Sequence, residues 1–151
     1  MSKTLARATA LLFALILPFG LAACSGATDP TQDAPADPAL AAQAEALDTY
    51  VANSQAQIPA IMDEFGTTYS EIRISAVQPD MVEYAYVFTD SLDPEAAVVY
   101  FDENVATLQD ACDTQLFPEM ASAGITIDPK VRYAYYNADG SLIWAHDFSP
   151  S

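Results

Sequence analysis

The chain has 151 residues, of which 21 are acidic and five are basic, so its formal net charge is −16 at pH 7. This excess of negative charge repels phosphate groups and argues against nucleic-acid binding, which depends on neutralising phosphates with lysine and arginine. It also argues against a basic patch as the means of attachment to anionic lipids.

The first 23 residues have the three-part pattern of an export signal. A short basic segment precedes an apolar stretch that is too short and too broken to span a bilayer of about 30 Å as a helix. The signal ends in Leu21, Ala22 and Ala23 before Cys24, a sequence that resembles the lipobox of bacterial lipoproteins.

This resemblance implies that the signal peptide is cleaved before Cys24 and that the Cys24 thiol carries lipid, with palmitate among the attached groups. Two or three acyl chains hold a protein durably on a membrane, whereas one does not. The predicted location is therefore the outer face of the bacterial cytoplasmic membrane. The alternative is a plain secretory signal followed by an incidental cysteine.

Three segments follow from this interpretation: a signal peptide over residues 1–23, a lipid anchor and disordered tether over 24–38, and one extracytoplasmic domain over 39–151. The tether is rich in proline and aspartate and has no large apolar residue, so it cannot build a core. The remaining length is ordinary for a single domain.

The first half of this domain predicts a helix followed by a hairpin. Apolar residues at three- and four-residue spacing predict a helix from Ala39 to Gly66, which Pro59 should kink or break. Alternating apolar and polar residues over 70–88 then predict two strands joined by a turn at "QPD".

The second half repeats this plan. Asp93 is a good N-cap, with Pro94 at the first helical position, and the apolar stripe that follows ends near Gly124. Pro118 should kink or break this helix. Alternation returns over residues 130–148, interrupted by "NADG", which predicts a turn with Gly140 in the left-handed conformation.

The order of elements predicts an α+β fold, in which two successive helix plus β-hairpin units form a four-stranded antiparallel sheet with helices on one face. The alternation assigns the strand residues to two faces, one apolar and one charged, and the charged face should hold cross-strand pairs of opposite sign. The apolar set is Ile72, Ile74, Tyr84, Tyr86, Phe88, Tyr133, Tyr135, Trp144 and Phe148, and the charged set is Arg73, Ser75, Glu83, Arg132 and Asp147.

The C-terminal stretch "AGITIDPKVRYAYYNADGSLIWAHDFS" resembles the C-terminal signature of a family of small, uncharacterised lipoproteins of Gram-positive bacteria, actinobacteria and firmicutes. The matching features are a Gly-Ile pair, an Asp-Pro dipeptide, a tyrosine-rich strand and the Asn-x-Asp-Gly turn. "YSEIRISA" and "MVEYAYVF" resemble the first hairpin of that family. These are turn and core motifs, and the family is a domain of unknown function, so the resemblance implies a fold and a location but no activity.

The residues with reactive side chains predict structural roles. His146 is the only histidine, and Asp147, its neighbour on a strand, points to the opposite face and cannot readily orient it. We therefore expect a partly buried structural histidine. Cys112 lies in an apolar helical stripe with acids nearby, and both surroundings raise a thiol pKa, the wrong direction for reactivity.

The acids on the predicted helices lack the loop spacing of a calcium site and are expected to be solvated. Neither a phosphate-binding glycine loop nor a nucleophile elbow is present. The sequence therefore predicts no enzyme, no metal and no cofactor.

The tyrosines are numerous for so small a sheet, and two interpretations stay open. They either cap the core beneath the helices or form a binding face, for which Tyr136, Tyr135 and Trp144 are the candidates. The predicted function is a membrane-anchored surface lipoprotein that acts as a non-enzymatic binding or interaction module for an envelope protein or a small ligand. The alternative is a structural or adaptor component of the envelope that assists a transporter or a wall enzyme.

Overall fold

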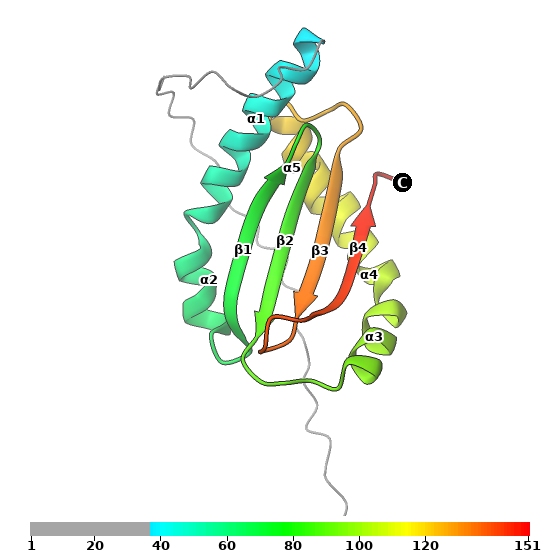
Figure 1. Ribbon diagram of the computed structural model, residues 1–151. Helices are drawn as coiled ribbons and strands as arrows, with labels where there is room; N and C mark the ends of the chain where they lie inside the picture. The colour runs from blue at the N-terminus through cyan, green and yellow to red at the C-terminus, as the bar shows by residue number, and fades with distance from the viewer. Residues whose placement is uncertain (1–36) are drawn as a thin grey trace, which may run out of the picture.

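A computed structural model describes residues 37–151, so the predictions for the signal peptide, Cys24 and most of the tether lie outside the described residues. The described chain forms two helical segments, each followed by a pair of strands (Figure 1). The elements are α1 (Pro38–Gln55), α2 (Ile58–Phe65), β1 (Tyr69–Val77), β2 (Met81–Phe88), α3 (Pro94–Glu103), α4 (Val105–Ala111), a π-helical turn (Cys112–Leu116), α5 (Phe117–Ser122), β3 (Lys130–Tyr136) and β4 (Leu142–Phe148).

The two helical segments begin where capping residues satisfy the first backbone N–H groups. The Asp37 side chain accepts a hydrogen bond from the backbone N–H of Ala39 at 2.9 Å, at the start of α1. Asp93 accepts from the backbone N–H of Glu95 at 3.0 Å, as its position in the sequence predicts. These bonds satisfy donors that have no partner within the helix.

Both prolines interrupt their helices, as predicted. Pro59 lies in the first turn of α2, after α1 has ended at Gln55. Pro118 lies in the first turn of α5, directly after the π-helical turn, where the backbone N–H of Phe117 donates to the carbonyl oxygen of Cys112. Proline lacks the N–H that a regular turn requires, so the chain changes its helical pitch just before it.

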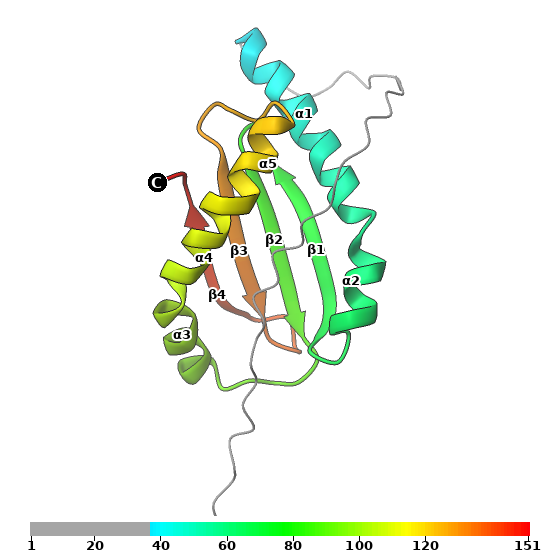
Figure 2. The same ribbon diagram turned by 180° about the vertical axis from the view of Figure 1, so that it is seen from behind.

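The predicted antiparallel sheet is wrong in its central pair. The strand order is β1-β2-β3-β4, and β1–β2 and β3–β4 are antiparallel, but β2 and β3 run parallel. The reason is the long connection through α3–α5, which returns the chain to the end of the sheet where β2 begins (Figure 2). The backbone N–H of Lys130 donates to the carbonyl oxygen of Asp80 there, at 2.9 Å. The α+β class is retained, but the sheet is mixed and the two units have differently broken helices.

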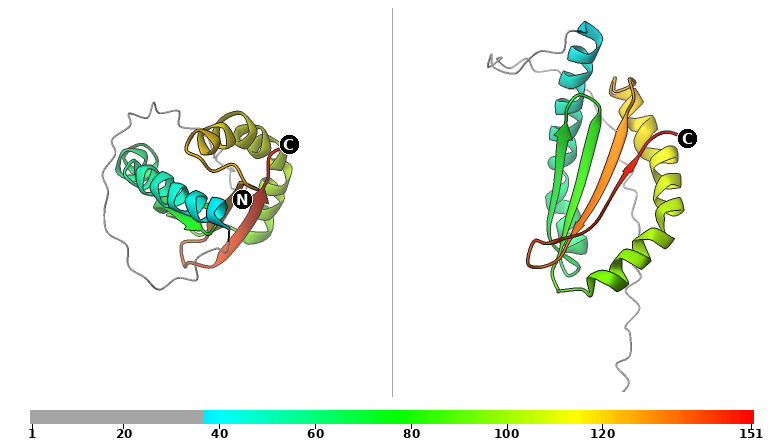
Figure 3. Two further views of the ribbon diagram at one scale, coloured as in Figure 1. Left: turned by 90° about the horizontal axis from the view of Figure 1, so that it is seen from above. Right: turned by 45° about the vertical axis from the view of Figure 1, so that its right-hand side comes forward.

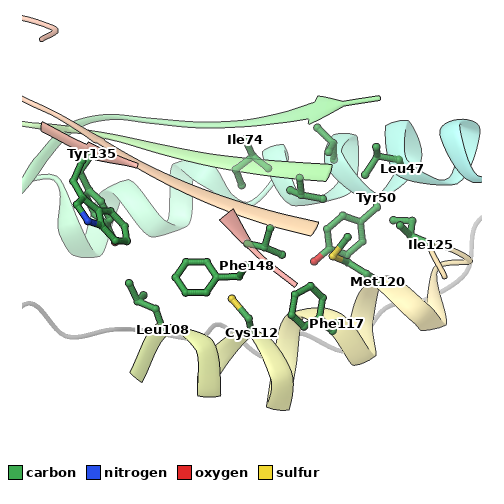
Figure 4. Close-up of a cluster of buried hydrophobic side chains, with 14 of the residues drawn as sticks. Leu47, Tyr50, Ile74, Leu108, Cys112, Phe117, Met120, Ile125, Tyr135 and Phe148 are labelled. Atoms are coloured by element: carbon green, nitrogen blue, oxygen red, sulfur yellow. The ribbon is translucent and has the colours of Figure 1, made fainter. Parts of the chain in front are cut away.

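All helices lie on one side of the twisted sheet, with α1–α2 along β1 and α3–α5 along β3 and β4 (Figure 3). We call the side toward the helices the covered face. Its side chains and those of the helices form one core, in which Leu108, Cys112 and Phe117 point from the second helical segment toward Phe148 (Figure 4). None of the helices within residues 37–151 has the length and apolar character needed to cross a membrane.

Candidate functional site: the open face of the sheet

The side of the sheet away from the helices has no element packed over it in the described chain (Figure 1). We call it the open face. Alternation and register place on it the predicted charged set together with a row of small and apolar residues. Its members are Glu71, Arg73 and Ser75 of β1, Glu83, Ala85 and Val87 of β2, Arg132, Ala134 and Tyr136 of β3, and Leu142, Ala145 and Asp147 of β4.

A charged row crosses the open face from β2 to β4. Arg132 donates from Nε to Asp147 Oδ1 at 2.6 Å and from Nη2 to Asp147 Oδ2 at 2.8 Å, which is a bidentate pair. Its Nη1 lies 3.6 Å from Glu83 Oε2. The hydrogen bonds from Arg132 lower the pKa of Asp147, and the same bonds raise the pKa of Arg132. These are the cross-strand pairs of opposite sign that the alternation predicts.

An aromatic and apolar region lies beside this row. The guanidinium of Arg73 lies 5.4 Å from the ring centre of Tyr136, within the range of a cation–π interaction. The bulge after Tyr135 brings Leu142 opposite Tyr136, and Leu142 is 56 % exposed. An exposed leucine beside a tyrosine gives this part of the open face apolar contact area.

Ala134 and Ala145, beside the charged row, line a shallow depression of about 430 Å³. Ala85 and Ala134 are only 2 % and 1 % exposed, although no helix covers them, because the larger side chains around them stand higher. The lining includes Tyr136, Leu142, Arg132 and Asp147. The depression is open to solvent, so its shape suits a protruding side chain of a protein surface better than an enclosed small molecule.

Charge is distributed unequally between this face and the rest of the domain. Residues 37–151 contain three basic side chains, Arg73, Lys130 and Arg132, and all three are ion-paired on or beside the open face. Lys130 Nζ lies 2.7 Å from Asp80 Oδ2. The other acids of the described chain, including those of the helices, have no basic partner. The open face is therefore nearly neutral on an otherwise acidic domain.

The three candidate aromatic residues are divided between the two faces. Tyr136 lies half-buried on the open face. Tyr135 and Trp144 are buried in the core on the covered face, where the Tyr135 ring stacks on Phe101 at 4.2 Å. Trp144 Nε1 donates to Asp102 Oδ1 at 2.9 Å. Tyr136 is therefore the one candidate of the three that a partner on the open face would contact.

The other tyrosines of the sheet lie on the covered face. Tyr84, Tyr86 and Tyr133 are half-buried, and their rings stack across β2 and β3 at 5.5 and 6.2 Å. Burial raises their pKa well above the usual value of a phenol. The Tyr50 hydroxyl joins α1 to this row through Tyr84, with the two oxygens 3.4 Å apart. This arrangement matches the interpretation that the tyrosines cap the core.

Cys112 lies far from the open face, and His146 lines the depression beside Asp147 but takes no part in the open-face ion pairs. His146 is exposed rather than partly buried, because it lies on the edge strand β4, with its ring 4.6 Å from that of Phe148. Asp147 points to the other face and binds Arg132, as predicted. Cys112 is fully buried, and burial together with Asp113 raises its pKa to about 12. Its thiol therefore stays protonated at neutral pH and is a poor nucleophile.

Within residues 37–151, no group of three or more His, Cys, Asp or Glu side chains is placed to hold a metal ion. The sequence interpretation missed Leu142 and the Arg73–Tyr136 contact as parts of the site. The alternation already placed both arginines on one face, but the bulge that brings Leu142 to Tyr136 had no signal in the sequence.

Comparison with models of protein families, with curated proteins and with solved structures found no match for this chain.

Proposed function

We propose that this protein is a lipid-anchored, extracytoplasmic interaction module that binds a protein of the cell envelope through its open face. The observation that carries the proposal is the charge distribution: the basic side chains of the described domain are paired at the open face, and the rest of the surface carries unpaired acids. A partner that docks there meets little net charge, whereas docking on the helical side would bury unpaired carboxylates, which is costly.

The composition of the open face supports a protein partner. Tyrosine and arginine are enriched at protein–protein interfaces, and Tyr136 lies in contact with Arg73. Leu142 adds exposed apolar area, and the shallow depression beside it can accept a side chain. Lipid attachment at Cys24 would hold this face outside the membrane, on a tether that reaches roughly 40 Å if extended at about 3.1 Å per residue.

The test of the open face uses paired substitutions in the full-length protein. We expect Tyr136→Ala with Leu142→Ser to abolish a stoichiometric complex that is captured by mild crosslinking of intact cells. The matched control is Tyr100→Ala with Val99→Ser on α3, which removes the same kinds of side chain from the helical side. Tyr100 is 38 % exposed, and Val99 is 57 % exposed, a fraction similar to that of Leu142.

Two results would contradict the proposal. One is loss of the complex in the α3 control but not in the open-face variant, with both proteins folded by circular dichroism. The other concerns the anchor: intact-protein mass spectrometry that finds an unmodified Cys24 or an uncleaved N-terminus would rule out the lipid attachment.

A further inference from the structure

The two edges of the sheet differ in what covers their backbone. At the β1 edge, α1 and α2 lie alongside the strand, and Gln55 Nε2 donates to the carbonyl oxygen of Ile74 at 2.7 Å (Figure 1). At the β4 edge, the backbone of 142–148 forms hydrogen bonds with β3. No other part of residues 37–151 donates to it or accepts from it. The backbone of β1 therefore receives a side-chain hydrogen bond at its outer edge, whereas the backbone of β4 receives none from the described residues outside β3.

The β4 strand carries a bulge but lacks the side chains that also prevent edge-to-edge pairing. Natural edge strands carry lysine, proline or unpaired charges that disfavour a neighbouring strand. The sequence "LIWAHDF" contains no lysine or proline, and its one charged side chain, Asp147, is neutralised by Arg132. A bulge near Ile143 limits the regular part to the C-terminal residues of the strand.

We propose that β4 pairs with β4 of a second copy in antiparallel orientation, so that the two sheets become one eight-stranded sheet. This inference goes beyond the proposed envelope partner, because it concerns the edge of the sheet and needs no other protein.

The side chains of β4 favour a second copy of the same strand as its partner. A two-fold axis at Ala145, the middle residue of the strand, places Ala145 opposite its own counterpart and Trp144 opposite His146 of the other copy. Small residues then meet on the axis, and two flat rings meet beside it, a favourable cross-strand combination. Asp147, the one charged side chain of β4, lies two residues from the axis, so the two copies of Asp147 do not face each other. The strand is thus complementary to itself.

The acids near this edge predict how the association responds to salt. α3 packs on β4, so pairing brings the two α3 helices near each other on the covered side. α3 carries Glu95, Asp102 and Glu103 and no basic residue. Their mutual repulsion is screened by ions, with a Debye length of about 10 Å at 0.1 M salt. Self-association should therefore strengthen as the salt concentration rises, opposite to an interaction held by ion pairs.

The experiment measures self-association of the full-length chain in a mild nonionic detergent, by sedimentation velocity over a wide range of protein concentration. We expect a monomer–dimer equilibrium. Hydrogen exchange on the same samples should show amide protection that rises with protein concentration in 142–148 and not in 69–77. The second measurement assigns the contact to the β4 edge.

Ala145→Lys tests the axis, because it places two cations opposite each other at an exposed position. We expect a dissociation constant increased by about tenfold or more, since like charges meet across the contact. Ala106→Lys is the matched control, because Ala106 is exposed on α4, and we expect it to change the constant by no more than about twofold.

The proposal is overturned by a monomer at all concentrations, by equal effects of the two lysine variants, or by protection that rises at β1 instead of β4. A complex of β4 with an extended segment of another protein, in place of the homodimer, would also overturn it. Ala145 also lines the depression of the open face, so these measurements use the purified chain alone, in which no envelope partner is present and failure of the dimer leaves the proposed function untouched.

Discussion

The two faces of one sheet use the same strands for different purposes. On the covered face, neighbouring aromatic rings lie 5.1 to 6.1 Å apart from Tyr69 of β1 across to Trp144 of β4 and pack against the helices. On the open face, the neighbouring residues of the same strands form ion pairs and a floor of alanines. Successive strand residues point to opposite sides, so a single strand can stabilise the fold with one half of its residues and meet a partner with the other half.

Alkaline pH should destabilise the covered face far more than the open face, because the buried tyrosines of the covered face must ionise. Burial raises the pKa of Tyr69 to about 12 and that of Tyr135 well above its usual range. A raised folded-state pKa contributes stability that is fully present below the unfolded value of about 10 and is lost as the pH rises toward the folded value. Each such group loses about 1.4 kcal/mol of stabilisation for every pH unit in that interval.

Since the pKa values of several tyrosines are raised in this way, we expect the domain to unfold cooperatively between pH about 10 and 12. Tyrosinate absorbance and circular dichroism should change together over this interval. Tyrosines that ionise one by one near their usual pKa, in a chain that remains folded, would show that the covered face is not sealed by its helices.

Removal of a core ring should lower the free energy of unfolding far more than removal of an apolar side chain from the open face. Phe148 is 1 % exposed and lies at the centre of the core. Phe148→Ala should lower the free energy of unfolding by about 3–5 kcal/mol. Leu142→Ala should lower it by no more than about 0.5 kcal/mol, because Leu142 is mostly exposed. Urea unfolding of both variants measures this difference, and similar losses would mean that Leu142 belongs to the core.

A buried amide holds the loop that precedes α3, and its loss should have an intermediate effect. Asn137 is buried, its Oδ1 accepts from the Leu92 backbone N–H at 2.8 Å, and its Nδ2 donates to the Leu92 carbonyl oxygen at 3.0 Å. Asn137→Ala leaves both backbone groups without this partner, and we expect a loss of about 1–3 kcal/mol.

Asp139→Ala, in the same turn, is the control for Asn137→Ala. The Asp139 side chain is exposed and binds only Ser141, so the loss should stay below about 1 kcal/mol. Thermal and urea unfolding would compare them, and a larger loss for Asp139→Ala would refute the assigned role of Asn137.

The ion pairs of the open face should contribute least to stability. Asp147→Asn removes the bidentate partner of Arg132, and because both side chains are partly exposed we expect a loss of about 0.2–1 kcal/mol. The pKa of Asp147 is lowered in the folded state, so this contribution is present above the unfolded value of about 3.9 and is lost as the pH falls below it. The difference between wild type and variant should therefore vanish in acid, and a difference that persists there would contradict the ion-pair explanation.

The features that the sequence predicts well are local ones. The caps at Asp93 and Pro94, the left-handed Gly140 and the separation of the strands into two faces each depend on a few neighbouring residues. The parallel pairing of β2 with β3 was mispredicted, because it depends on where a long helical connection returns the chain. No local pattern in either strand specifies its direction relative to a strand far away in the sequence.

In the candidate site, too, the sequence predicts the features that depend on neighbouring residues and misses those that depend on distant ones. Successive strand residues point to opposite faces, so Tyr136 lies with the charged residues and Tyr135 does not. Tyr135 and Trp144 are buried because Phe101 of α3 packs over them, and the position of α3 depends on the whole fold. Leu142 belongs to the site because a bulge places it opposite Tyr136. The near-neutral charge of the face is visible only once the ion pairs of all three basic residues are placed.

The most direct test of the account is a photo-crosslinking residue placed in the full-length protein at Leu142 or at Val99, which are 56 % and 57 % exposed. We propose that the open face, and not the acidic helical side, contacts an envelope partner. In intact cells, the account predicts a discrete crosslinked product of a second protein from position 142 and none from position 99. A product from position 99 alone would contradict it.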